Sequence, residues 1–331
     1  MSRLTAPRLA VSFALVGLSA AGCASDAPSG PPLDPNESLG CAEGAALYGA
    51  GTTTASIEHD GLTRTFRVHV PPGVDGSTPV PIVLMFHGGG GSGQQLENAS
   101  SQMDQVADRE GFITVYPDGT GSIRTWNGGG CCGSAAASNV DDVGFVDALL
   151  DHLGTTTCHD RRRVYASGMS NGAILSHRLG CELADRIAAI APVSGTDMTA
   201  SCTPSRPVPT MQIHGTEDGH VPWDGGVGCG PSMASFTSVP TTIDRWRTRN
   251  ACSSGPTAYF AQGDGQCDAY GACAGAADVV LCAIDGGGHS WPGGAPNVGV
   301  VDCPADGAQS TTFDASEAIW SFFDAHPRAS F

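Results

Sequence analysis

Residues 163–179 read Arg163-Val-Tyr-Ala-Ser-Gly-Met-Ser-Asn-Gly-Ala-Ile-Leu-Ser-His-Arg-Leu179. A strand-like run leads into Gly168-Met-Ser-Asn-Gly172, and a helical pattern leads out of it. A strand that turns this sharply into a helix exposes the central hydroxyl, and the flanking glycines avoid a steric clash in the turn. We interpret Ser170 as a nucleophile. The alternative is a serine that only caps a Gly-rich turn.

The rest of the chain repeats this alternation of short apolar runs and amphipathic segments. A hairpin is predicted around Asp60-Gly61, and strands and helices follow in turn. The sequence therefore predicts an α/β protein with a mostly parallel sheet, an antiparallel first edge, helices on both faces and sites at the carboxyl ends of strands. The expected strands are 53–58, 63–70, 81–86, 112–116, 164–167, 187–193, 208–213 and 279–283, and the expected helices are 142–153, 171–183, 242–249 and 314–325.

A glycine-rich loop, His87-Gly-Gly-Gly-Gly-Ser-Gly93, follows the third predicted strand. Without side chains in the way, its main-chain N–H groups can approach a substrate oxygen. We expect Gly88 or Gly89, together with the N–H of Asn171, to form an oxyanion hole. A flexible turn is the alternative. A phosphate-binding loop of the Walker type is excluded because the chain contains no lysine.

A nucleophilic serine needs a base, and the base needs an orienting carboxylate. His289 follows the last predicted strand and is the expected base, with His87 as the rival. Asp218 follows the strand ending at Ile213 and is the expected acid. Glu217 and Asp224 are the second and third choices for the acid. The resulting chain order is serine, aspartate, histidine.

Other residues near these loops carry weaker signals. Trp126 and Trp291 are candidate substrate-binding residues, and each also fits a packed loop aromatic. Asp141 and Asp142 precede an amphipathic helix, and we expect a cap and first turn rather than a metal site. We expect Cys131 and Cys132 to bond to different partners, because a disulfide between adjacent residues is strained.

The N-terminus and the cysteines indicate export. Residues 1–22 have the basic start and apolar stretch of a signal peptide, and Ala-Ala-Gly-Cys23 resembles a lipobox, so Cys23 is the expected lipidation site. Residues 23–50 are expected to be a tether and 51–331 the catalytic domain. The remaining 12 of 13 cysteines suit a disulfide framework, whereas no spacing suits a metal site. A net charge of -17 argues against nucleic-acid binding.

Together these motifs resemble the poly(3-hydroxybutyrate) depolymerase and feruloyl esterase group of α/β hydrolases. The resemblance covers about residues 55–327. It rests on His87-Gly-Gly-Gly, Trp126-Asn127 with Cys131-Cys132, Asn139-Val-Asp-Asp-Val-Gly-Phe145, Gly168–Gly172, His214-Gly-Thr-x-Asp218 and His289-Ser-Trp-Pro-Gly293.

The resemblance implies an eight-stranded α/β-hydrolase fold and an acyl-enzyme mechanism without a cofactor. Some depolymerases of the group carry a cysteine at the position of Gly89, which leaves the second oxyanion donor open. Only 14 residues separate Val193 from Val208, so no large lid is expected there. The expected substrate is a polymeric or bulky ester, and the expected membrane contact is the N-terminal lipid alone. Feruloyl or acetyl xylan ester hydrolysis, peptide hydrolysis and a non-catalytic surface lipoprotein are the alternatives.

Overall fold

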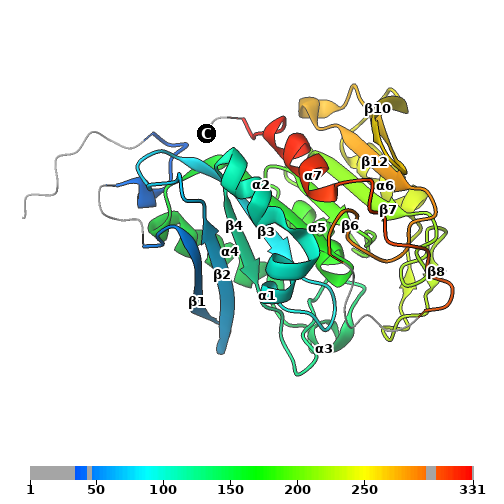
Figure 1. The fold of residues 1–331 in the computed structure, drawn as a ribbon, viewed down its shortest axis with the longest axis horizontal. Helices are drawn as coiled ribbons and strands as arrows, with labels where there is room; N and C mark the ends of the chain where they lie inside the picture. Colours follow the sequence, from blue (N-terminus) through cyan, green and yellow to red (C-terminus); the bar gives the residue numbers. More distant parts are fainter. Residues whose placement is uncertain (1–33, 43–46, 296–302, 330–331) are drawn as a thin grey trace, which may run out of the picture. The chain divides into compact units, whose positions relative to one another are not determined.

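The computed structural model describes residues 34–42, 47–295 and 303–329 (Figure 1). The signal peptide, Cys23 and the first part of the tether lie outside the described residues. Among the helices that are described, none combines the length and apolar character that a membrane crossing requires.

A ten-stranded sheet forms the centre of the described domain, in the order β1-β2-β4-β3-β5-β6-β7-β12-β11-β10. Neighbouring strands from β4 to β12 run parallel, and both edges are antiparallel. The strands are β1 Gly51–His59, β2 Leu62–Val70, β3 Val80–Phe86, β4 Ile113–Pro117, β5 His159–Met169, β6 Ile190–Val193, β7 Thr210–Gly215, β10 Thr257–Gln262, β11 Gly265–Tyr270 and β12 Val279–Ile284. A separate two-stranded ribbon pairs β8 Gly226–Val227 with β9 Ser235–Phe236.

Helices cover both faces of the sheet because its central strands are apolar on both sides. In β3, Ile82, Leu84 and Phe86 pack toward one face, whereas Val83 and Met85 pack toward the other. Helices α4, α5 and α6 bury their apolar side chains on the first face, and α2 and α7 on the second (Figure 1). The α-helices are α1 Gly93–Gln95, α2 Met103–Glu110, α3 Gly133–Ala137, α4 Asp142–Thr156, α5 Asn171–Glu182, α6 Val239–Arg249 and α7 Ala315–Asp324. Other helical turns are η1 Leu39–Cys41, η2 Leu96–Ser101 and η3 Ala274–Ala276.

The expected fold class is confirmed, but the strand count was too low. The prediction missed β10 and β11, which form a hairpin that extends the sheet beyond β12. Most residues of β10 are exposed, so the sequence of this strand shows no apolar alternation. Of the long segment 229–275, only the first part, around residues 230–236, reaches the site described below.

Six disulfides join all twelve cysteines that follow Cys23. The expectation that Cys131 and Cys132 bond to different partners was wrong, because they bond to each other while the other ten pair among themselves. The remaining pairs are Cys41–Cys158, Cys181–Cys202, Cys229–Cys303, Cys252–Cys273 and Cys267–Cys282. Such a density of disulfides is typical of proteins that fold in an oxidising compartment.

Candidate active site

Ser170 occupies the sharp turn between β5 and α5. Its backbone has φ 56° and ψ −119°, a strained conformation for a residue with a side chain. A Cβ at position 168 would lie 2.5 Å from the carbonyl oxygen of Phe86, and one at 172 would lie 2.1 Å from it. Glycine is therefore required on both sides of the serine. The turn that the motif predicted is present, and it holds Ser170 beside the end of β3.

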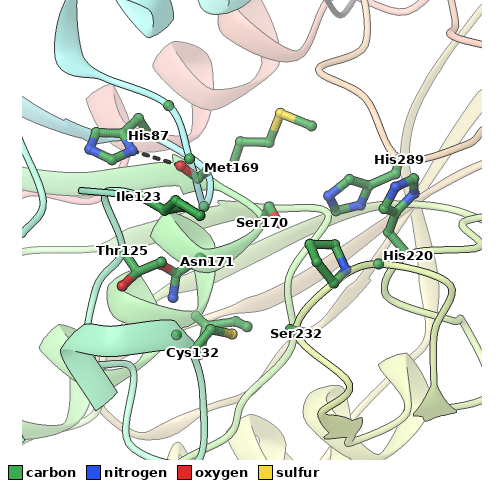
Figure 2. A pocket seen from close by; sticks show the side chains of 18 of the residues that line it. His87, Ile123, Thr125, Cys132, Met169, Ser170, Asn171, His220, Ser232 and His289 are labelled. Atoms are coloured by element: carbon green, nitrogen blue, oxygen red, sulfur yellow. Dashed lines mark hydrogen bonds between the residues drawn. The ribbon is translucent and has the colours of Figure 1, made fainter. Parts of the chain in front are cut away.

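Ser170 opens into a cavity of about 620 Å³. This volume lies in the usual range for small-molecule sites, roughly 300–1,000 Å³. Figure 2 shows Ser170 between the loop of His87 and Met169 on one side and the rings of His289 and His220 on the other. The cavity is lined by residues from 87–100, 122–134, 169–174 and 220–236, with His289.

Asp218 and His289 form a buried pair at this cavity. Nδ1 of His289 lies 2.9 Å from Oδ2 and 3.1 Å from Oδ1 of Asp218. The main-chain N–H groups of His220 and Val221 donate to Oδ1 of the same carboxylate, at 3.0 and 2.8 Å. These bonds fix Asp218 and favour a proton on Nδ1 of His289. Nε2 of His289 is then the ring nitrogen that can accept a proton.

The pKa values of this pair move in opposite directions. Burial alone would raise the pKa of Asp218, but the charge and hydrogen bond of His289 and the hydrogen bond of His214 hold it well below its usual range. Burial lowers the pKa of His289, but Asp218 and the charge of Asp306 outweigh burial and raise it above the ordinary value. Both shifts favour a stable imidazolium–carboxylate pair once His289 has taken a proton.

The rival candidates lie elsewhere or are already engaged. Glu217 and Asp224 are exposed, and neither contacts His289 through a described hydrogen bond. The Nε2 atom of His87 accepts a hydrogen bond from Gly119 N at 2.9 Å, so its Nδ1 donates to the carbonyl of Gly88 at 2.7 Å. Burial lowers the pKa of His87 to about 4. The geometry therefore selects His289 and Asp218.

The glycine-rich loop lies directly against Ser170. A Cβ at Gly88 would be 3.4 Å from Cβ and 4.0 Å from Oγ of Ser170. Asn171 is the first residue of α5, so its main-chain N–H has no partner within the helix. The side chain of Asn171 donates to the carbonyl of Trp126 and accepts from its N–H, at 2.9 and 2.6 Å. The loops around Ser170 are thereby tied together, with Gly88, Gly89 and Asn171 all lining the cavity.

Of the two interpretations of Trp126 and Trp291, the structure contradicts the substrate contact and agrees with the packed loop aromatic. Trp126 and Trp291 are fully buried, and neither lines the cavity. Trp126 donates from Nε1 to the carbonyl of His87 and packs edge-on against Phe86. Trp291 donates from Nε1 to Oγ of Ser316 and packs in the core on the sheet face that α2 and α7 cover. Both support the loops from behind and offer no platform to a ligand.

The expected helix cap is confirmed for Asp141, and the neighbouring Asp142 makes further contacts. Asp141 caps α4 by accepting from Gly144 N at 2.9 Å. Asp142 is fully buried, pairs with Arg64 at 2.7 Å and accepts from Asn127 N at 2.7 Å. It therefore anchors the loop that carries Trp126.

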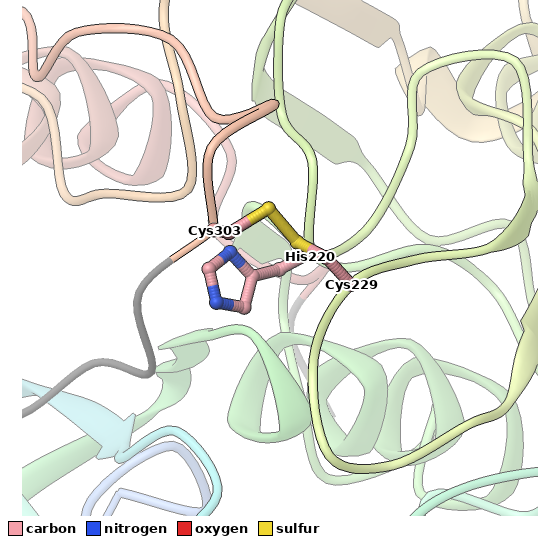
Figure 3. A group of neighbouring side chains, drawn as sticks. All are labelled: His220, Cys229 and Cys303. Atoms are coloured by element: carbon pink, nitrogen blue, oxygen red, sulfur yellow. A yellow bond between two sulfur atoms is a disulfide. The ribbon is translucent and has the colours of Figure 1, made fainter.

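Among the described residues, three groups of side chains combine metal-ligand residue types, and in each group some of these side chains already bind one another or a neighbouring residue. His220 lies with Cys229 and Cys303, whose sulfurs form a disulfide (Figure 3). His220 also lies with Asp218 and His289, which are hydrogen-bonded to each other. The third group is His69, Glu97 and Asp104, where Glu97 pairs with Arg67.

Sequence reasoning missed three residues around His289. His214 is fully buried, with its Nε2 3.3 Å from Oδ2 of Asp218. His220 stacks on His289, and Asp306 contacts the main chain of His289. His214 lies near the end of β7, four residues before Asp218, and His220 follows Asp218 by two residues, so the neighbourhood of Asp218 in the sequence was itself a signal. Asp306 lies in a segment without helix or strand and carries no signal in the sequence.

Similar proteins are found by family model, by sequence and by structure. Residues 64–224 match the family model described as esterase PHB depolymerase. The chain is 32% identical to feruloyl esterase B of Piromyces equi over 237 aligned residues. The alignment covers 69% of this chain and 42% of that protein. It is 28% identical to the putative esterase NocK of Nocardia uniformis subsp. tsuyamanensis, over 84% of this chain and 87% of that protein. The native crystal structure of sOPH superposes with a TM-score of 0.55 at 18% identity, over 88% of this chain and 91% of that one, and shows the same fold.

Proposed function

Because this chain belongs to the PHB depolymerase and feruloyl esterase group of α/β hydrolases, we propose that it is a serine carboxylic-ester hydrolase. One observation carries the proposal. The strained Ser170 and His289, which is paired with the buried Asp218, line a single cavity.

In the proposed reaction Ser170 Oγ attacks the ester carbonyl while His289 Nε2 takes its proton. The main-chain N–H groups of Asn171 and of Gly88 or Gly89 stabilise the oxyanion. His289 then protonates the leaving alcohol, and an acyl-enzyme remains on Ser170. A water molecule, deprotonated by His289, releases the acid and restores the serine. Asp218 holds the imidazole in the required tautomer throughout.

The walls of the cavity favour an aliphatic acyl group. Among the described residues that line it, none is Asp, Glu, Lys or Arg, and Phe236 is the only aromatic residue other than histidine. Aliphatic contacts come from Leu96, Ile123, Ile174 and Val221. Such walls match a short hydroxyacid unit, because its alkyl part can contact the aliphatic side chains while its ester oxygens meet the serine, threonine and glutamine side chains that also line the cavity. We therefore propose a polyester of the poly(3-hydroxybutyrate) type as substrate.

A second candidate substrate is a feruloyl or acetyl ester of a plant cell-wall polysaccharide. It is favoured by the 32% identity to a feruloyl esterase. The burial of Trp126 and Trp291 argues against it, because none of the described residues that line the cavity is a tryptophan that could stack on an aromatic acid.

Substrate choice is tested by acid release from two polymers side by side. We expect the purified domain to release acid from amorphous poly(3-hydroxybutyrate) at least tenfold faster than ferulate from feruloylated arabinoxylan, because of the aliphatic walls. Ser170→Ala serves as the blank. Faster release from the arabinoxylan would contradict the polyester substrate and favour feruloyl ester hydrolysis.

The location of the protein is also a proposal. The six disulfides support export, and the Ala-Ala-Gly-Cys23 sequence supports lipid attachment at Cys23. The expected tether, residues 23–50, is shorter than predicted, because its described part is bound to the domain through the Cys41–Cys158 disulfide and the hydrogen bond from Ser38 to the carbonyl of Thr157. The remaining residues before it would then hold the catalytic domain near the membrane surface, within reach of an external polymer.

Cys23→Ser tests the lipid anchor. We expect the wild-type chain, expressed in a lipoprotein-processing bacterium, to fractionate with the membrane and the variant to lose this association. Two acyl chains bury enough CH₂ groups, at about 0.8 kcal/mol each, for stable attachment. Mass spectrometry of the N-terminal peptide checks the modification. An unmodified Cys23 in a membrane-free wild-type protein would contradict the proposal.

A further inference from the structure

A second histidine lies against the base of the proposed mechanism. The ring of His220 stacks on the ring of His289, with centroids 4.7 Å apart and planes 22° from parallel (Figure 2). His220 is 7% exposed, lines the cavity and follows Asp218 by two residues. The hydrogen bond that Nδ1 of His289 donates to Asp218 holds one edge of the His289 ring. A flat ring on its face restricts the tilt that this bond leaves free.

A second carboxylate lies behind both histidines. Oδ1 of Asp306 accepts hydrogen bonds from the main-chain N–H groups of His289 and Gly219, at 2.8 and 2.9 Å. Its Oδ2 lies 3.3 Å from Nδ1 of His220. The charge of Asp306 also contributes to raising the pKa of His289, after the larger effects of burial and Asp218. One side chain thus contacts the loops that carry the proposed acid and the proposed base.

The segment that carries Asp306 is fastened to these loops. Cys303 bonds to Cys229, and a Cβ at Gly219 would lie 2.7 Å from its sulfur (Figure 3). The N–H of Gly307 donates to the carbonyl of Glu217 at 2.8 Å. The disulfide and these contacts fix the position of Asp306 relative to His220 and His289.

We propose that His220 and Asp306 are positioning residues that hold the imidazole of His289 in line with Ser170. This inference rests on the proposed function. In the part of the chain that the structure describes, the titratable or charged side chains around His289 include Asp218, His214, His220 and Asp306, of which sequence reasoning anticipated only the first.

The stacking is tested by His220→Ala and His220→Phe. We expect His220→Ala to lower kcat for a soluble p-nitrophenyl ester by about 10–100-fold with KM within threefold, because a small misplacement of a catalytic group is costly. His220→Phe retains a flat ring and is expected to recover kcat to within about threefold. A raised KM with unchanged kcat, or a phenylalanine variant as slow as the alanine one, would overturn the proposal.

The carboxylate is tested by Asp306→Asn, which retains an acceptor for both N–H groups but removes the charge. Neutral His289 is the active base, so activity falls as pH drops through its pKa. Without the Asp306 charge that pKa is lower, and we expect the acid limb of kcat/KM to move about half a pH unit toward acid. Asp285→Asn, an exposed carboxylate four residues before His289, is the control and leaves the limb in place. An identical profile for Asp306→Asn and wild type would refute the electrostatic role.

Ester hydrolysis by wild type and by Ser170→Ala separates the proposed function from the inference about His220 and Asp306. An inactive wild-type protein, or an active Ser170→Ala variant, would remove the proposed function itself. With an active wild type and an inactive Ser170→Ala variant, the results for His220 and Asp306 decide the inference alone.

Discussion

Replacing Ser170 by alanine is expected to lower kcat for ester hydrolysis by about 10⁶-fold. The variant loses the only atom that can form the acyl-enzyme, while His289 and the glycine-rich loop remain. Residual catalysis of about 10³–10⁴ over water should persist, because an oxyanion hole and a binding cavity act without the nucleophile. The fold should be unaffected, since the hydroxyl lies at the cavity and alanine has the same Cβ. The measurements are kcat with p-nitrophenyl butyrate and Tm.

Ser176→Ala is the matched control for this experiment. Ser176 lies in the same helix, one turn and a half after the elbow, and its hydroxyl donates to the carbonyl of Gly172 at 2.9 Å. It does not line the cavity, so its loss should leave kcat within about threefold. A fluorophosphonate should add one mass adduct to wild type and to this variant, and none to Ser170→Ala. An adduct on Ser170→Ala would place the nucleophile elsewhere.

The elbow could be predicted because its constraints are local. Gly168 and Gly172 must be glycine since both approach the carbonyl of Phe86, and a strand, a turn and a helix leave their patterns in one continuous stretch. The same holds for Asp218 and His289, each of which follows a recognisable strand. The parallel order of those strands then brings their carboxyl ends, and hence these side chains, together.

The surroundings of the site could not be predicted in this way. Whether Trp126 is buried depends on a bond to the carbonyl of His87, 39 residues away. The place of Asp306 depends on the Cys229–Cys303 bond, and a sequence with twelve cysteines does not reveal its pairing. Both are contacts between distant loops, for which no periodicity exists. Strand β10 of the extra hairpin escaped notice because its residues are largely exposed and show no apolar alternation.

Asp218→Asn is expected to lower kcat by about 10⁴-fold while leaving KM nearly unchanged. The amide oxygen can still accept from the N–H groups of His220 and Val221, so the loop should keep its shape. The amide nitrogen, however, is a donor where His289 also needs to donate from Nδ1. The ring then favours a proton on Nε2, which can no longer accept the proton of Ser170. Stopped-flow or steady-state kinetics with p-nitrophenyl butyrate measure the loss.

The pH profile of Asp218→Asn adds an independent readout. Asp218 is the main group that raises the pKa of His289 against the effect of burial. Without its charge that pKa falls, so the acid limb of the residual activity should move to lower pH, further than in Asp306→Asn. Glu217 is an exposed neighbour of Asp218, and Glu217→Gln should change neither kcat nor the pH at which the acid limb falls. If Asp306→Asn caused the larger loss and the larger shift, Asp306 would be the orienting acid and Asp218 its support, because these are the two described carboxylates that hydrogen-bond to His289.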